Sequence, residues 1–224
     1  MLPLLKYEQR LNFTENIMSI KIRKALREDT KFLAQMILLS SRADKKIGMF
    51  DVVFNYMSDK DLLENIEKLT TTSIKNYCHF SNFLIAEIDS KCVGTLCSYE
   101  PRIATQESFL NSLKEIGSKV NTDEYEKIFH QCDFNQNKRT LIFDFMEEVE
   151  GFIDVGILKA LMKKSLLSAR LKGYRIAQAI VEIGSLETIL FYKTLGFKEI
   201  KQRECEKYRE KFGRNGLALF EIEF

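Results

Sequence analysis

The chain has 224 residues, of which 45% are hydrophobic and 17 are Phe. This length and composition are sufficient for a large buried core, in one domain or in two small ones. Lys and Arg together number 34, Asp and Glu together number 32, and the net charge is +2. Because nucleic-acid-binding proteins usually carry a basic excess, this balance argues against a nucleic-acid partner.

The cysteines are odd in number and include no C-x-x-C pair; they are Cys78, Cys92, Cys97, Cys132 and Cys205. This usage is typical of reduced thiols in a cytoplasm, so we expect all of them to be free. The two histidines, His79 and His130, lack metal-ligand spacing to each other or to a cysteine, and we expect no metal site.

The chain starts with MLPLLKYEQR, which has no basic n-region and too short an apolar run for a signal peptide. No apolar run approaches the length of a membrane-spanning helix. We therefore expect a cytoplasmic protein without a membrane partner. Only two prolines and no Gly/Ser-rich linker occur, which favours one domain from residue 18 onward. Residues 1–17 are expected to be an N-terminal extension.

The first predicted element is a strand over residues 19–25, where apolar and polar residues alternate. Residues 27–42 predict a helix with an apolar stripe, and either Asp29 or Thr30 is its expected N-cap. A second helix is expected over residues 58–74, because it starts with a serine followed three residues later by an aspartate.

A hairpin is predicted next, with arms over residues 83–88 and 91–99 and a turn at Asp89-Ser90. Pro101 should end the second arm, since proline cannot donate to a strand ladder. The polar stretch of residues 102–138 contains helical patches and is interpreted as a helical insertion, in which Asn121 and Glu124 are suited to cap the second helix.

The last part of the chain predicts two buried strands, each followed by a helix, and then two closing strands. The near-continuous apolar run RTLIFDFM is expected in the centre of the sheet. In chain order these elements cover residues 139–146, a helix ending at 171, 174–184, 186–195, 197–206 and 216–224. Helices between strands imply a mixed α/β fold in which helices cover the faces of a sheet.

The segment SLETILFYKTLGF, residues 185–197, resembles the N-x-x-A-x-x-x-Y-x-x-x-G-F passage of the GNAT superfamily of acyl-CoA-dependent N-acetyltransferases. Tyr192, Gly196 and Phe197 match in register, while Ser185 stands at the Asn and Thr188 at the Ala. The element order is similar from residue 19 to residue 224. This resemblance implies a mixed, mostly antiparallel central sheet with helices on both faces, over residues 18–224.

The weakest match is the acyl-CoA loop, which in the family reads V-x-P-x-x-[RQ]-G-x-G-x-[GA]. Here the corresponding residues are acidic and poor in glycine. The resemblance implies acetyl-CoA as cosubstrate, its pyrophosphate lying on free amides of about residues 152–157 at a helix N-terminus. The cofactor-binding residues that it implies are Met146, Glu148, Gly151, Phe152, Ile153, Asp154, Val155, Gly156, Ile157 and Ser185. As the plainer alternative, Asp154 caps the helix and its carboxylate competes with a phosphate.

In the family, the residue matched by Tyr192 is the usual general acid for the departing thiolate, which implies this role here. Its alternative is a packing residue beside Phe191. Asp144, on the predicted central strand, is a candidate general base. Its alternative is a strand carboxylate that faces solvent or pairs with a Lys or Arg.

These residues lead to two main hypotheses, and an acyl-CoA-dependent enzyme with a different acyl group or acceptor is a third. The first is an N-acetyltransferase that acts on a primary amine, either a small molecule or a peptide, with residues 102–138 as a wall or lid of the acceptor site. The second is a GNAT-like pseudoenzyme that binds or regulates and has weak or no acetyl-CoA turnover, because its loop is acidic and poor in glycine. Exposed strand ends would also allow a homodimer.

Overall fold

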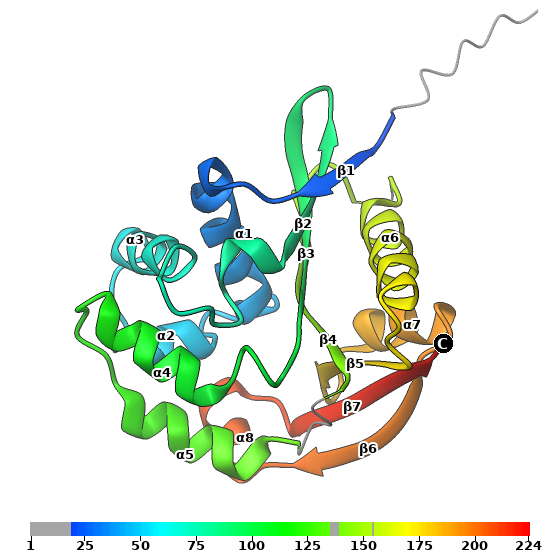
Figure 1. Cartoon of the computed structure of the whole chain (residues 1–224). Helices are drawn as coiled ribbons and strands as arrows, with labels where there is room; N and C mark the ends of the chain where they lie inside the picture. Colours follow the sequence, from blue (N-terminus) through cyan, green and yellow to red (C-terminus); the bar gives the residue numbers. More distant parts are fainter. Residues whose placement is uncertain (1–18, 135–138, 154) are drawn as a thin grey trace, which may run out of the picture.

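The structure is a computed structural model that describes residues 19–134, 139–153 and 155–224 (Figure 1). Within these residues the strands are β1 (Lys21–Lys24), β2 (Phe83–Ile88), β3 (Lys91–Tyr99), β4 (Leu141–Glu148), β5 (Ile176–Glu182), β6 (Lys198–Glu204) and β7 (Gly216–Glu223). The helices are α1 (Thr30–Arg42), α2 (Met49–Val53), α3 (Asp59–Leu69), α4 (Gln106–Glu115), α5 (Thr122–Cys132), α6 (Ile157–Leu171), α7 (Leu186–Thr194) and α8 (Glu206–Phe212). Two 3-10 turns, η1 (Arg27–Asp29) and η2 (Phe80–Asn82), complete the elements.

The strands form one sheet in the order β1-β2-β3-β4-β5-β7-β6. Strands β4 and β5 pair in parallel, and the other neighbouring pairs are antiparallel. In Figure 1 the helices α1 to α5 lie on one side of the sheet and α6 lies on the other. The mixed, mostly antiparallel sheet with helices on both faces is therefore confirmed.

Two large apolar clusters hold these layers together, one on each face of the sheet. On one face, Leu33 of α1 and Leu62 of α3 pack with Ile85 of β2. On the other face, Leu161 of α6 packs in the cluster that contains Ala86 of β2. Consecutive residues of β2 thus enter different clusters, as the two-residue period of a strand requires.

Strand β4, the middle strand of the sheet, carries a bulge at the position that matters most for the site. Phe145 has a φ of 41°, and two residues of β4 stand between Asp144 and Glu147 where β3 has one between Thr95 and Cys97. The bulge interrupts the alternation, so Phe143 packs in the cluster of α6 but Phe145 packs in that of α1.

The parallel pair of β4 and β5 separates halfway along its length. Its ladder ends at Phe143 on β4 and Ala179 on β5, although the two strands continue to Glu148 and Glu182. Beyond these two residues the strands no longer pair. A gap therefore opens in the middle of the sheet, at the carboxyl-terminal ends of β4 and β5.

Most predicted elements are present, and two cap predictions are confirmed. The Ser58 hydroxyl accepts a hydrogen bond from Asp61 N–H at the start of α3, and the Asn121 side chain accepts one from Glu124 N–H at the start of α5. Asp29 takes the N-cap position of α1 without a capping bond. Its carboxylate instead accepts hydrogen bonds from Leu26 N–H and from Arg23, both at 2.7 Å.

Helices α2 and α8 were not predicted, because each is a short segment held by tertiary contacts. Val52 of α2 packs with Tyr208 and Phe212 of α8 in a third apolar cluster. Helices this short gain little from their own backbone hydrogen bonds, so packing stabilises them.

The expectation that all cysteines are free is wrong for one pair. Cys132, at the end of α5, and Cys205, just before α8, form a disulfide whose Cα atoms are 5.6 Å apart. Cys78, Cys92 and Cys97 are free. The disulfide lies in the cluster that also holds α2 and α8, and it therefore ties the helical insertion to the C-terminal strands.

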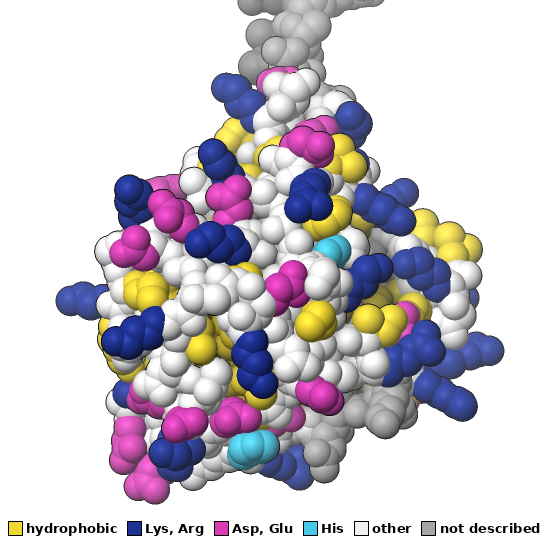
Figure 2. Space-filling view, turned by 60° about the vertical axis from the view of Figure 1, so that its left-hand side comes forward, with side chains coloured by type: hydrophobic (Ala, Val, Ile, Leu, Met, Phe, Trp, Pro, Cys, Tyr) yellow, Lys and Arg dark blue, Asp and Glu magenta, His cyan; other side chains and the backbone are white. Residues whose placement is uncertain are grey.

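The outer surface carries both signs of charge. On the face shown in Figure 2, Lys and Arg side chains are spread among Asp and Glu side chains. In the described ranges, no helix has both the length and the apolar character needed to cross a bilayer.

Candidate active site

A cleft of about 1240 Å³ opens where β4 and β5 diverge. One part of it, the α6–α7 half, is lined by Ile153, Leu158, Ser185, Phe191 and Tyr192. The other part, the α4–α5 half, is lined by Tyr77, Tyr99, Phe109, Tyr125, Phe129 and Asp133. Residues 143–148 of β4 also line the cleft.

Asp144 lines the cleft near residues of both halves, since its charge acts on the hydroxyls of Tyr99 and Tyr192. Its carboxylate Oδ1 accepts a hydrogen bond of 2.8 Å from Phe145 N–H, the residue at the bulge. Burial raises the pKa of Asp144 to about 6, and the Phe145 N–H opposes this rise. In the described residues no Lys or Arg forms an ion pair with Asp144. The carboxylate is thus mostly ionised at neutral pH and accepts a proton with a pKa that suits a general base.

Tyr192 lines the α6–α7 half from the last turns of α7. Its ring packs edge-on against Phe197 with centroids 5.0 Å apart and lies 6.2 Å from the ring of Phe220. Burial, followed by the negative charge of Asp144, raises the pKa of Tyr192 above its usual value. Among residues that the structure describes, none forms a hydrogen bond with the Tyr192 hydroxyl. The hydroxyl is therefore protonated and able to donate.

The loop between β4 and α6 leads into a helix N-terminus beside the cleft. The N–H of Phe152 donates to the Val149 carbonyl at 3.1 Å, and that of Val155 donates to the Phe152 carbonyl at 3.3 Å. These two amides, which we expected to be free, are used by the loop itself. Within the described part of this loop and helix, the N–H groups of residues 157–159 have no acceptor.

Helix α6 starts close to the sheet because β3 has a glycine beneath it. A Cβ added to Gly94 would lie 2.6 Å from Cγ2 of Ile157, the first residue of α6. Ile157 is fully buried, while the next residue, Leu158, lines the cleft. The first turn of α6 is thereby fixed at the edge of the α6–α7 half.

Two further residues of the lining are Ser185 and Glu147. Ser185 occupies the N-cap position of α7, but its side chain makes no capping hydrogen bond, and it lines the cleft. Burial raises the pKa of Glu147, and the negative charges of Asp44 and Glu148 add to the rise. The acidic character of this region is thus present in the cleft and not only in the sequence.

Solved structures share this arrangement of elements. An N-acetyltransferase from Staphylococcus aureus Mu50 superposes with a TM-score of 0.68 at 14% identity, over 90% of this chain and 100% of that one. A crystal structure of an acetyltransferase gives 0.66 at 16% identity, over 91% and 98%. A GNAT-family acetyltransferase from Staphylococcus aureus Mu50 gives 0.52 at 17%, over 92% and 99%. No protein-family model and no curated protein matches the sequence.

The chain has the GNAT acetyltransferase fold. Six of the residues chosen from the sequence line the cleft of this fold: Asp144, Met146, Glu148, Ile153, Ser185 and Tyr192. Gly151, Phe152, Val155, Gly156 and Ile157 lie in the adjoining loop and helix start, outside the lining. Asp154 lies outside the described residues.

The sequence did not predict which residues line the α4–α5 half of this GNAT-fold cleft. Helices α4 and α5 come from the predicted insertion, and they place an aromatic wall there. The rings of Tyr77 and Phe109 stack with centroids 4.5 Å apart, and Tyr125 lies 5.4 Å from Phe109. The hydroxyls of Tyr77 and Tyr125 share a hydrogen bond of 3.0 Å. In the sequence, the signal for this wall was the two apolar patches of the insertion, which begin at Phe109 and Tyr125.

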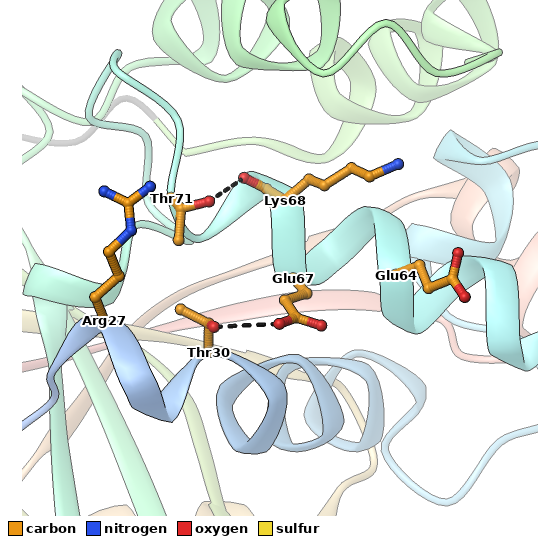
Figure 3. A pocket seen from close by; sticks show the side chains of 6 residues that line it. All are labelled: Arg27, Thr30, Glu64, Glu67, Lys68 and Thr71. Atoms are coloured by element: carbon orange, nitrogen blue, oxygen red, sulfur yellow. Dashed lines mark hydrogen bonds between the residues drawn. The ribbon is translucent and has the colours of Figure 1, made fainter.

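A smaller hollow of about 480 Å³ lies between the start of α1 and the end of α3, and none of its residues lines the cleft. Figure 3 shows its six lining side chains, in which Thr30 Oγ1 donates to Glu67 at 3.4 Å and Thr71 Oγ1 donates to the Lys68 carbonyl at 3.2 Å. Its lining mixes acidic and basic side chains, so we do not consider it a site for acyl transfer.

Proposed function

We propose that the chain is an N-acetyltransferase that moves an acetyl group from acetyl-CoA to a primary amine. The observation that carries this proposal is the pair formed by Asp144, with a pKa of about 6, and the protonated Tyr192 in one cleft. A proton acceptor and a proton donor are the two groups that this direct transfer needs.

The residues present fit a coenzyme A thioester in two respects. The N-terminus of α6 lies at the cleft edge, where Leu158 lines the cleft, and the positive end of the helix dipole there suits a pyrophosphate. Beyond Phe143, β4 still pairs with β3 but its other edge no longer pairs with β5, and this edge suits an extended amide chain such as pantetheine. When bound, acetyl-CoA supplies the acetyl group as a thioester.

The groups of the chain then act on protons and on position. Asp144 accepts a proton from the ammonium form of the acceptor, directly or through a water, so that the amine lone pair becomes available. The cleft holds the amine against the carbonyl carbon, which removes the entropic cost of a bimolecular encounter. Tyr192 donates its hydroxyl proton to the sulfur that leaves, since no neighbouring group takes this proton first.

The proposal is tested by adding acetyl-CoA and a panel of primary amines to the purified chain and measuring release of free thiol. Calorimetric titration with acetyl-CoA and with CoA measures binding separately. Thiol release that depends on the amine, together with binding of acetyl-CoA, supports the proposal. No release with any amine would contradict it.

The second candidate is a binding or regulatory module with the same fold. The observation that favours it is the acidic cleft edge, where Glu147 and Glu148 lie next to the loop that would receive a polyphosphate. This candidate predicts weak or no acetyl-CoA binding in the same titration, whereas the acetyltransferase requires binding and turnover together.

A further inference from the structure

The lining of the cleft is strongly acidic. Among the described residues, its carboxylates are those of Asp44, Asp133, Asp144, Glu147, Glu148, Glu182 and Glu187, and its single guanidinium is that of Arg214. Among the residues described, no Lys lines the cleft. The chain as a whole has a net charge of +2, so the negative charge is a local property of the cleft.

Arg214, the one cation in the described part of the lining, is already paired. Arg214 Nε lies 3.5 Å from Glu182 Oε2, and the other oxygen of Glu182 pairs with Lys45 and accepts a hydrogen bond of 2.6 Å from Tyr208. Glu182 is therefore compensated, and Arg214 does not neutralise the rest of the lining.

Four other carboxylates have no such partner. In the part of the chain that the structure describes, Asp44, Asp133, Asp144 and Glu147 form no ion pair. Burial raises the pKa of Asp133, while a hydrogen bond from the Phe134 N–H and, less strongly, the charge of Arg203 oppose this rise. Asp44 is exposed, whereas Asp133, Asp144 and Glu147 are partly buried. A partly buried carboxylate without a counter-charge is costly, and a bound cation would relieve that cost.

The carboxylates share the cleft with an aromatic surface. The charges of Asp144 and Asp133 both act on the Tyr99 hydroxyl, so both carboxylates lie near Tyr99. The ring of Tyr99 is 5.9 Å from that of Tyr77, which stacks on Phe109. Aromatic faces attract ammonium groups and pack against methylene chains. One ammonium group at Asp144 and a second at Asp133 would thus be joined by a chain lying on this surface.

We propose that the acceptor is a small amine with at least two positive charges, a linear diamine or polyamine. Its reacting amine lies at Asp144 and its second amine near Asp133, with the carbon chain between them on Tyr77 and Tyr99. This inference rests on the proposed acetyl transfer and specifies its substrate class. An acceptor that carries a carboxylate or phosphate beside its amines is excluded, because the unpaired carboxylates would repel it.

Pairs of acceptors that differ in one group test this inference. The purified chain is given acetyl-CoA with putrescine or n-butylamine, which differ in the second amine, and with cadaverine or lysine, which differ in the carboxylate. We expect kcat/KM for each diamine to exceed that of its partner at least tenfold, and this advantage to shrink as NaCl rises. Equal kcat/KM values within either pair would overturn the inference. Faster transfer to Nα-acetyl-lysine amide, which mimics a peptide, than to the diamines would also overturn it.

A variant locates the second charge. Asp133→Asn is expected to raise KM for putrescine about tenfold more than KM for n-butylamine. Asp123→Asn, the same change on an exposed residue of α5 outside the lining, is the matched control and should leave both values unchanged. Thermal melting shows whether each variant folds. An equal rise in KM for both amines would overturn the placement of the second amine.

The two proposals fail in different ways. If no amine releases thiol, acetyl transfer fails and the substrate class falls with it. If acetyl-CoA releases thiol at similar rates with monoamines, diamines and lysine as acceptors, acetyl transfer stands and only the substrate class is overturned. Calorimetric titration with spermidine in the absence of acetyl-CoA gives a readout that does not depend on turnover, and absence of binding there would count against the acidic site.

Discussion

Asp144 on β4 and Tyr192 on α7 line one cleft, and the negative charge of Asp144 helps to raise the pKa of the Tyr192 hydroxyl. Burial also raises the pKa of Asp144 itself, but only to about 6. At neutral pH one group is therefore mostly ionised and the other is protonated. Two titratable groups whose pKa values are separated in this way are suited to act as base and acid.

The first prediction concerns the pH dependence of turnover. Asp144 must be ionised to accept a proton, so kcat at saturating acetyl-CoA and amine should fall as pH drops through about 6. At pH 5 we expect kcat about tenfold below its plateau value, following a single ionisation. The Tyr192 pKa lies above the usual range, so no loss of activity from Tyr192 ionisation is expected up to pH 9. A kcat that is flat from pH 5 to 8 would contradict the role of Asp144.

The second prediction concerns the stability of Asp144→Asn. Because the folded pKa of Asp144 is raised from 3.8 to about 6, the folded state gains a proton more readily than the unfolded state. Stability linked to this proton is fully present below pH 3.8 and is lost as pH rises through about 6. The shift sets an upper limit of about 3 kcal/mol, and solvent near this half-buried side chain reduces it to about 1–2 kcal/mol.

Asn keeps an oxygen for the Phe145 N–H and has no charge to bury, so Asp144→Asn should be more stable than the natural chain at pH 7.5 and nearly equal at pH 4. Guanidinium unfolding at both pH values measures the difference, and kcat of the same variant should fall at least a hundredfold. A loss of stability at pH 7.5 would show that Asp144 is a structural residue.

The third prediction separates the hydroxyl of Tyr192 from its ring. Tyr192→Phe keeps the packing on Phe197 and removes a hydroxyl without a hydrogen-bond partner in the described chain. We expect the free energy of unfolding to stay within about 0.5 kcal/mol and kcat to drop by about 10² or more.

Tyr174→Phe is the matched control for Tyr192→Phe, because Tyr174 lies outside the cleft lining and interacts with Glu100. It should retain full kcat. If Tyr192→Phe also retained full kcat, another donor would have to protonate the leaving thiolate.

The parts of the fold that could be predicted from the sequence are those specified by local signals. Turn residues at 89–90 placed both arms of the hairpin, and Ser58 placed the start of α3. Asp29 also carried a local signal, but its carboxylate bonds to Arg23 across a turn instead of capping α1. Helix α8 carried no comparable signal, because it is stabilised by distant residues of α2 and α5.

The site was predictable to the extent that a motif fixed single positions. Tyr192 was found by its register with Gly196, and Asp144 by its place on the central strand. The bulge at Phe145, which places Asp144 and Phe145 one after the other beside the cleft, has no sequence signature. The sequence also did not show which loop amides are used by turns within the loop, such as the Phe152 N–H that donates to the Val149 carbonyl. The acidic and aromatic wall needs α4 and α5 folded against the sheet.

The last prediction concerns the disulfide between Cys132 and Cys205, which are 73 residues apart in the sequence. Closing a loop of this length lowers the entropy of the unfolded chain, so Cys132→Ala/Cys205→Ala should lose about 2–4 kcal/mol of unfolding free energy. Reductant should lower the melting temperature of the natural chain and not that of the double variant. Thiol titration in guanidinium without reductant should find the three free cysteines, and Cys92→Ala should reduce this to two while keeping the response to reductant. Titration of all five thiols in the natural chain would show that the bond does not form.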